Sequence, residues 1–264
     1  MRHCLFVLLC TCGLAACADN NTPAAEATEA TTPEEETVSE AVTVHPVYHG
    51  SLVLTQGERT IYIDPYGGAE RYASFPAPDL VLITHTHPDH LDPATLGAFD
   101  LSGATLLAPA AVIEADSIVQ AFAERHTLAN GETYNWRDVT IEAIPAYNPP
   151  PKENFHPEGK FNGYVVDFGD DNQRFYISGD TEGVPAMREL QDIDVAFVAM
   201  NLPYTMDVDQ AAESVLAFAP REVYPYHYRN QDGSKSDVDA FRKQVTAGNP
   251  EIQVQLGNWY PDVE

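Results

Sequence analysis

Hydrophobic and polar positions alternate in short runs along most of this 264-residue chain, from about residue 41 onward. Short apolar runs bounded by Gly, Pro, Asn or Asp predict strands, whereas apolar residues recurring every three or four positions predict helices. Strands are expected at 42–49, 51–56, 60–64, 80–84, 105–108, 139–144, 163–167, 174–178, 195–200, 222–225 and 252–256. Helices are expected at 93–98, 110–124, 185–190, 208–218 and 237–246. This mixture predicts an α/β fold.

Polar residues at two helix starts sharpen this prediction. Asp92 precedes Pro93, which is an N-cap followed by proline at the first helical position. Asp207 with Gln210 three residues later resembles a capping box. The segment 147–162 shows neither the strand pattern nor the helix pattern of apolar residues and contains three consecutive prolines, which predicts a long loop. Such loops often carry functional residues.

The first 40 residues differ in composition from the rest. Arg2, an apolar stretch and then Leu14-Ala15-Ala16-Cys17 resemble a lipoprotein signal over 1–17, in which cleavage leaves Cys17 as the lipidated N-terminus. An ordinary secretory signal is the alternative. Residues 18–40 contain seven acidic and no basic side chains, which predicts a disordered tether. The remaining 41–264 is long enough for one domain with a sizeable core.

These features predict an exported bacterial lipoprotein on the periplasmic side of the envelope. Ala18 rather than Asp follows Cys17, which favours the outer membrane. All four cysteines lie within the first 17 residues, so 41–264 has no thiol for a disulfide or a metal. The formal net charge of −26 argues against a nucleic-acid partner, which needs a basic surface. Membrane contact is expected through the lipid on Cys17 only.

The densest chemistry is His85-Thr86-His87-Pro88-Asp89-His90, directly after the apolar run 80–83. Neutral imidazole and ionised carboxylate bind zinc and similar divalent metals. His85 and His87 are two positions apart and project to one side of an extended backbone. Pro88 then forces a turn, so that Asp89 and His90 can face a second position. Two-metal hydrolytic sites hold their ions roughly 3.5–4 Å apart.

Two more ligand-type residues follow predicted strands. Asp180 comes after 175–177, and His227 comes after 223–226. Strand ends at one edge of a sheet are where layered α/β folds place their sites, so we expect these side chains to converge with the histidine motif. A carboxylate can offer one oxygen to each of two ions, which makes Asp180 a candidate bridge.

With these residues the chain resembles the metallo-β-lactamase superfamily. His85 to His90 matches the HxHxDH signature, Gly179-Asp180-Thr181 the later bridging Asp, and His227 the last His. Ile63-Asp64-Pro65 matches the strand that precedes the signature. The resemblance implies a four-layer αββα sandwich with metals between the edges of two sheets. It also implies metal ligation by His85, His87, Asp89, His90, Asp180 and His227.

Within that superfamily the chain looks closest to the branch of ascorbate-6-phosphate lactonase-like proteins and the phospholipase D that cleaves N-acyl-phosphatidylethanolamine. His49-Gly50-Ser51 and Tyr224-Pro225-Tyr226-His227 carry this narrower resemblance. One departure concerns the third histidine of the first metal, since Ala146-Tyr147-Asn148 stands where the family has it. His156 folding back is one replacement and Asn148 another; with neither, the first site is weak and one ion remains.

We therefore expect a metal-dependent hydrolase that attacks an ester, lactone or phosphodiester with a metal-bound hydroxide. The expected cofactor is two Zn2+ ions, with Mn2+ or Fe2+ as alternatives, and Asp89 ligates metal and orients the nucleophile. The substrate is expected to be a small molecule or lipid-like, with Lys152 or Lys160 pairing with an anionic group on it. The alternatives are an iron-dependent oxidoreductase on the same scaffold and a non-catalytic anchored binding protein.

Overall fold

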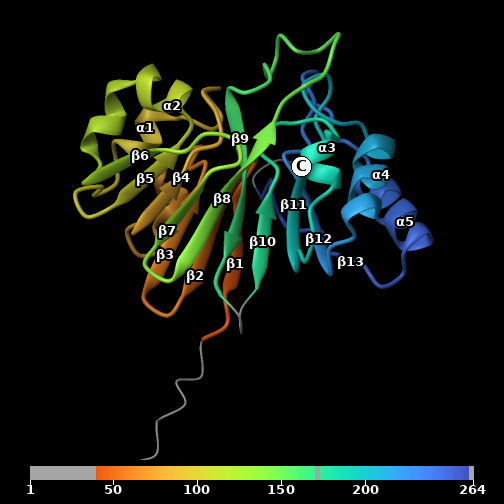
Figure 1. Cartoon of the computed structure of the whole chain (residues 1–264), viewed down its shortest axis with the longest axis horizontal. Coiled ribbons are helices and arrows are strands. Elements are labelled where there is room, and N and C mark those ends of the chain that lie inside the picture. The colour runs from red at the N-terminus through yellow and green to blue at the C-terminus, as the bar shows by residue number, and fades with distance from the viewer. Residues whose placement is uncertain (1–39, 170–172, 262–264) are drawn as a thin grey trace, which may run out of the picture. The chain divides into compact units, whose positions relative to one another are not determined.

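Two β-sheets form the centre of the described part of the chain, which is residues 40–169 and 173–261 of this computed structural model (Figure 1). From Glu40 onward these residues belong to one compact unit. The predicted signal at 1–17, the lipidated Cys17 and the tether up to residue 39 lie outside the described residues. Every helix within the described ranges is too short or too polar to span a bilayer.

The first sheet has the strand order β1-β2-β3-β4-β5-β6. Its first three strands are antiparallel, and β3 to β6 are parallel. Consecutive parallel strands all end at the same edge of a sheet. The bounds are Thr43–Tyr48 (β1), Ser51–Gln56 (β2), Arg59–Ile63 (β3), Leu80–Leu82 (β4), Thr105–Ala108 (β5) and Glu124–Thr127 (β6).

The second sheet has the strand order β13-β12-β11-β10-β9-β8-β7. Here β7 to β10 are antiparallel and β10 to β13 are parallel. The bounds are Thr133–Trp136 (β7), Val139–Ala146 (β8), Phe161–Asp167 (β9), Arg174–Ile177 (β10), Val195–Ala199 (β11), Glu222–Tyr226 (β12) and Gln253–Val254 (β13).

Helices cover the outer face of each sheet (Figure 1). On the first sheet these are η1 (Ala69–Tyr72), α1 (Pro93–Leu96), α2 (Ala110–Ala115) and η2 (Ser117–Ala121). On the second sheet they are α3 (Pro185–Arg188), α4 (Val208–Phe218) and α5 (Val238–Gly248). The layers are therefore helix, sheet, sheet and helix, which confirms the predicted αββα sandwich.

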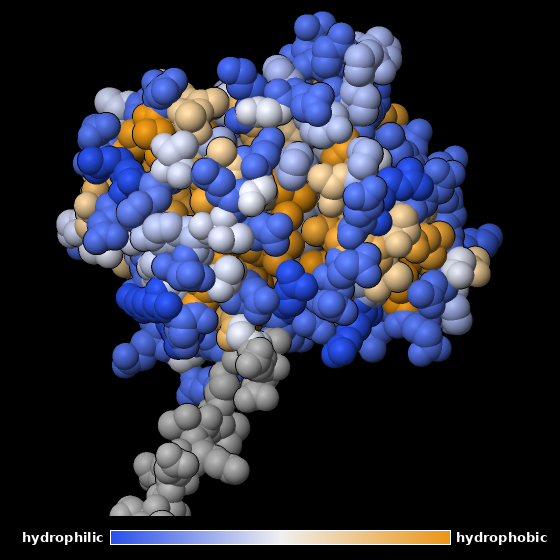
Figure 2. Space-filling view, viewed as in Figure 1, coloured by the Kyte–Doolittle hydropathy of each residue, from blue (hydrophilic) through white to orange (hydrophobic). Residues whose placement is uncertain are grey.

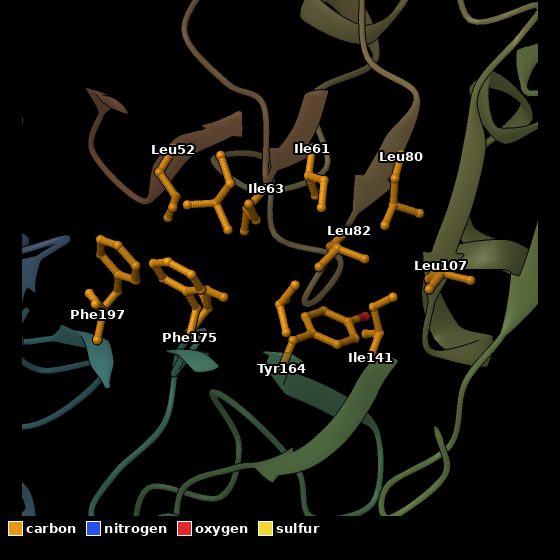
Figure 3. Close-up of a cluster of buried hydrophobic side chains, with 14 of the residues drawn as sticks. Leu52, Ile61, Ile63, Leu80, Leu82, Leu107, Ile141, Tyr164, Phe175 and Phe197 are labelled. Carbon is orange, nitrogen blue, oxygen red and sulfur yellow. The ribbon is translucent and has the colours of Figure 1, made fainter. Parts of the chain in front are cut away.

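The core lies in three layers that follow from this order. Figure 3 shows the central one, in which Leu52, Ile63 and Leu82 of the first sheet face Tyr164 and Phe175 of the second. Two further buried clusters lie between each sheet and its helices. Strands buried on both faces need nearly continuous apolar sequence, as in β11, whose five residues are all buried. Hydrophilic side chains cover much of the surface (Figure 2).

The predicted helix at 110–124 is wrong in its second half. α2 ends at Ala115 because Asp116 adopts an extended backbone, and the Asp116 side chain then accepts a hydrogen bond from the backbone N–H of Ile118 at the start of η2. Residues 124–127 form the edge strand β6. Both predicted helix starts are confirmed, since Asp92 accepts from the N–H of Ala94 and Asp207 from that of Gln210.

Candidate metal centre

The predicted site residues meet where strands of both sheets end. Asp64 follows β3 and the histidine motif follows β4, while Asp180 follows β10 and His227 follows β12. The structure brings them together in three overlapping groups whose ligand atoms lie within 4.8 Å of one another. The groups are His85, His87, His156 and Asp180; His90, Asp180 and His227; and His49, Asp89 and His227.

Asp180 lies between two sets of ligand atoms and presents a different oxygen to each. Its Oδ2 is 3.5 Å from Nε2 of His156 and 4.0 Å from Nε2 of His85. Its Oδ1 is 3.4 Å from Nε2 of His90 and 3.6 Å from Nε2 of His227. We call His85, His87 and His156 the first ligand group, and Asp89, His90 and His227 the second ligand group.

The first ligand group is completed by a loop residue. Nε2 of His85 is 3.1 Å from Nδ1 of His87, and His156 is fully buried beside them in the loop between β8 and β9. Asn148 cannot replace His156, because its Oδ1 accepts from Nδ1 of His156 and its Nδ2 donates to the carbonyl of Tyr204 at 2.9 Å. Asn148 thereby aims Nε2 of His156 at Asp180.

The second ligand group is held from behind by a buried carboxylate. Nδ1 of His90 donates to Oδ2 of Asp64 at 2.7 Å, and Asp64 also accepts from the backbone N–H and the hydroxyl of Thr84 at 2.7 and 2.6 Å. Nε2 of His227 is 3.3 Å from Oδ2 of Asp89 and 3.0 Å from Nε2 of His90. These contacts fix the start of the ligand loop, Thr84, and the ring of His90 against the buried carboxylate of Asp64.

Gly50 allows the second ligand group to close. A Cβ at this position would lie 2.9 Å from Cδ2 of His227 and 3.0 Å from Cε1 of His90. Non-glycine residues around the site also adopt the left-handed region, with φ of 57° at His49, 45° at Asp64 and 48° at His227. Such conformations are uncommon for these residues and cluster at functional sites.

The neighbouring histidines and carboxylates shift one another's pKa values at the site. Burial raises the pKa of Asp180, but His227, His90 and His156 outweigh it and hold this pKa below its usual value. Burial lowers the pKa of His90, yet Asp180, Asp64 and Asp89 together raise it to about 10. His90 is therefore doubly protonated in the absence of a metal ion. Ligation through Nε2 must displace the proton on that nitrogen, while Nδ1 keeps the proton that it donates to Asp64.

The donor set fits divalent metal ions. Nε2 of His156 and Oδ1 of Asp180 are buried without a hydrogen-bond partner among the described residues, and both belong to the cluster. An unpaired buried polar atom is costly, and metal coordination would satisfy both. Tetrahedral zinc with nitrogen and oxygen ligands places neighbouring ligand atoms roughly 3.3–3.5 Å apart, which is close to the separations measured around Asp180.

His49 belongs to the site although it is not among the predicted ligands. Its Nε2 is 3.1 Å from Oδ2 of Asp89, and its Nδ1 is 2.8 Å from the hydroxyl of Tyr260. Burial, followed by the neighbouring His227, lowers the pKa of His49 to about 4, so the ring is neutral. Facing a carboxylate, Nε2 carries the single proton and donates, while the Tyr260 hydroxyl donates to Nδ1. His49 thus orients Asp89.

A pocket of about 540 Å³ opens onto this cluster. It reaches Asp89, Asp180 and His87, and apart from Tyr48 of β1 it is lined by residues of loops that connect the strands of the two sheets. Lys152 and Lys160 do not line it, and Nζ of Lys152 instead pairs with Oε1 of Glu182 at 2.5 Å. The expectation that either lysine meets an anionic substrate group is not supported.

Comparisons with known proteins agree with this geometry. The chain matches the family model of the β-lactamase superfamily domain over residues 59–228, and it therefore belongs to that superfamily. A protein of Parabacteroides distasonis, assigned as a metal-dependent hydrolase, is 36% identical with a TM-score of 0.69; the match covers 81% of this chain and 92% of that one.

Curated relatives point to the same class. A UPF0173 metal-dependent hydrolase of Pyrococcus abyssi is 30% identical over an alignment of 202 residues, and the match covers 72% of this chain and 86% of the relative. One of Thermus thermophilus is 25% identical over 77% of this chain and 91% of the relative. The chain is a metal-dependent hydrolase of the metallo-β-lactamase superfamily, as predicted. Neither alternative activity is favoured, and the narrower resemblance to the lactonase and phospholipase branch stays a prediction.

Proposed function

We propose that the chain is a two-zinc hydrolase of an ester, lactone or phosphodiester bond. The observation that carries this proposal is Asp180, whose two oxygens face different histidine groups. A carboxylate in that position suits a pair of ions rather than one. The expected ligands are the first and second ligand groups together with Asp180.

The roles of the residues follow from their positions. When bound, zinc lowers the pKa of a coordinated water to about 7 and polarises the oxygen of the scissile group. Asp89 is one-third exposed at the pocket, where its carboxylate can hold an ion, orient the nucleophile and accept a proton. His49 keeps Oδ2 of Asp89 in place through its Nε2–H.

The test combines metal counting with a substrate screen. Purified protein is analysed by mass spectrometry for bound metals, and is assayed on nitrophenyl esters, lactones and a bis-nitrophenyl phosphodiester. His87→Ala and Asp89→Ala should abolish metal-dependent hydrolysis, whereas His126→Ala, in the distant strand β6, should not. Full activity in both site variants would sink the proposal, and stoichiometric iron with a redox-active spectrum would favour the oxidoreductase.

We also propose that the protein acts on a small-molecule or lipid-like substrate from the periplasmic side of the envelope, anchored by lipid on Cys17. Leu14-Ala15-Ala16-Cys17 supports this proposal. Metabolic labelling with a palmitate analogue should mark the wild-type protein and not Cys17→Ser. Labelling of the two to the same extent would contradict the anchor without bearing on the hydrolase.

A further inference from the structure

Arg229 places a positive charge at the wall of the pocket. It lies three residues after β12, and it is the only lysine or arginine among the described residues that line this pocket. The pocket also contains the carboxylates of Asp89 and Asp180, which belong to the metal centre. Metal ions at that centre would take up the negative charge of these two carboxylates. The charge of Arg229 then stays available for a ligand in the pocket.

Arg229 also has no carboxylate partner among the described residues. Five other arginines of this acidic protein pair with aspartates, namely Arg59 with Asp138, Arg137 with Asp79, Arg174 with Asp167, Arg221 with Asp194 and Arg242 with Asp239. Among the described residues Arg229 has no such ion pair, and its Nη1 contacts only the hydroxyl of Tyr48, at 3.3 Å. Its remaining donors are therefore available to a ligand.

The backbone of Arg229 is fixed beside the metal centre. Its N–H donates to the hydroxyl of Tyr260 at 3.1 Å, and Tyr260 is the residue that holds His49. Arg229 also forms an isolated β-bridge with Lys235. A fixed backbone removes one part of the ordering cost when the side chain binds an anion, which favours affinity.

Aromatic side chains give the pocket two apolar walls. Tyr48 and Tyr66 are stacked with ring centroids 5.9 Å apart. Phe155 and Tyr204 meet edge to face at 5.1 Å, and all four rings line the pocket. Its volume of about 540 Å³ is in the range of sites for small organic molecules.

We propose that Arg229 binds an anionic group, a carboxylate or a phosphate, on a small organic ester or lactone. The body of this substrate packs between the aromatic walls while its scissile bond lies at the metal centre. Guanidinium is suited to this role because its planar fork donates two parallel hydrogen bonds to either anion. A net charge of −26 repels anions from the rest of the protein, so selection of an anionic substrate requires a local cation. This inference rests on the proposed hydrolase function.

The first experiment measures kcat/KM of the metal-loaded enzyme for 4-nitrophenyl esters of equal chain length with a neutral, a carboxylate or a phosphate tail. Wild type should favour one or both anionic esters. Arg229→Gln should lower kcat/KM for the favoured anionic ester by about 10- to 100-fold, the usual effect of losing a charged hydrogen-bond pair, and change the neutral ester by less than about threefold. For the favoured anionic ester, kcat/KM of Arg229→Lys should fall between the values of the wild type and Arg229→Gln.

A control variant separates recognition from structure. Arg221→Gln removes an exposed arginine that pairs with Asp194 away from the pocket, and it should leave all three esters unchanged. An equal loss for charged and neutral esters in Arg229→Gln would overturn the inference, as would a wild type that prefers the neutral ester.

The second experiment does not need turnover. Calorimetry on the metal-loaded protein compares glutaric acid mono-4-nitroanilide with neutral 4-nitrobutyranilide, which replace the ester by a slowly hydrolysed amide. Tighter binding of the acid that is lost in Arg229→Gln supports the inference even if no ester is cleaved, which would count against the hydrolase instead. Equal binding of the acid by wild type and Arg229→Gln overturns the inference and leaves the hydrolase intact.

Discussion

The two ligand groups on either side of Asp180 are supported in different ways. In the second group, Nδ1 of His90 donates to the fully buried carboxylate of Asp64, which is itself fixed by two bonds from Thr84. In the first, Nδ1 of His156 donates to the neutral amide of Asn148, and both residues belong to a loop. Hydrogen bonds to an ionised group are about twice as strong as neutral ones. The second group is therefore the better preorganised half of the centre.

The largest loss of activity and metal binding should come from replacing Asp180, the carboxylate that the two ligand groups share. Asp180→Asn takes away one negative charge and one ligand oxygen, so both ions should be lost. Losing several kcal/mol of charge stabilisation corresponds to a fall of roughly a thousandfold in activity. Metal analysis and kinetics on the purified variant check this. Two retained ions with near wild-type activity would mean that Asp180 does not join the halves.

His156→Ala should separate the two halves. It removes the ligand that the loop supplies to the first group, so we expect about one ion per chain and an activity lower by roughly a hundredfold. His227→Ala is the matched change in the second group. If His156→Ala keeps two tightly bound ions, His156 is not a ligand, and the first ion is held by His85, His87 and Asp180 alone.

Asp64→Asn should weaken the second half alone. The carboxamide keeps the shape but removes the charge that holds the proton on Nδ1 of His90. Changes behind a ligand cost about 10- to 100-fold in metal affinity. Stepwise metal titration by calorimetry should show one weakened site and one unchanged site. A variant in which both sites weaken equally would contradict a separate support for each half.

Asn148→Ala should have the smallest effect. Only a neutral hydrogen bond to His156 is lost, which corresponds to about a tenfold loss of affinity for the first ion. The same titration measures it, and circular dichroism confirms that the fold is intact. A loss larger than that of Asp64→Asn would reverse the ranking of the two halves.

All ligands of the second group could be predicted from local sequence patterns, whereas one ligand of the first group, His156, was harder to assign. Residues 85–90 are contiguous, and Asp180 and His227 each follow a strand whose apolar run is easily recognised. His156 stands in a segment without periodicity. Its position depends on how the loop folds back, closed by the bond from the N–H of Asn148 to the carbonyl of His156 at 2.9 Å.

Long-range pairing accounts for the other misses. The contact of His49 with Tyr260 joins positions 211 residues apart, and no local pattern encodes it. The edge strand β6 is not predicted, and its first residue, Glu124, falls at the end of the expected helix, because the residues of β6 are mostly exposed and polar and lack the period-two pattern of a half-buried strand. Edge strands gain their identity from the neighbour with which they pair.

The loop that supplies His156 also forms a wall of the pocket, through Asn154 and Phe155. Substrate and metal consequently share one short stretch of backbone. With His156 as the proposed ligand, a molecule that binds Phe155 and steadies the loop would also steady His156 against the ion, and by thermodynamic reciprocity the ion would tighten the binding of that molecule by the same factor. We therefore expect changes at Asn154, Phe155 or His156 to alter specificity and metal occupancy together.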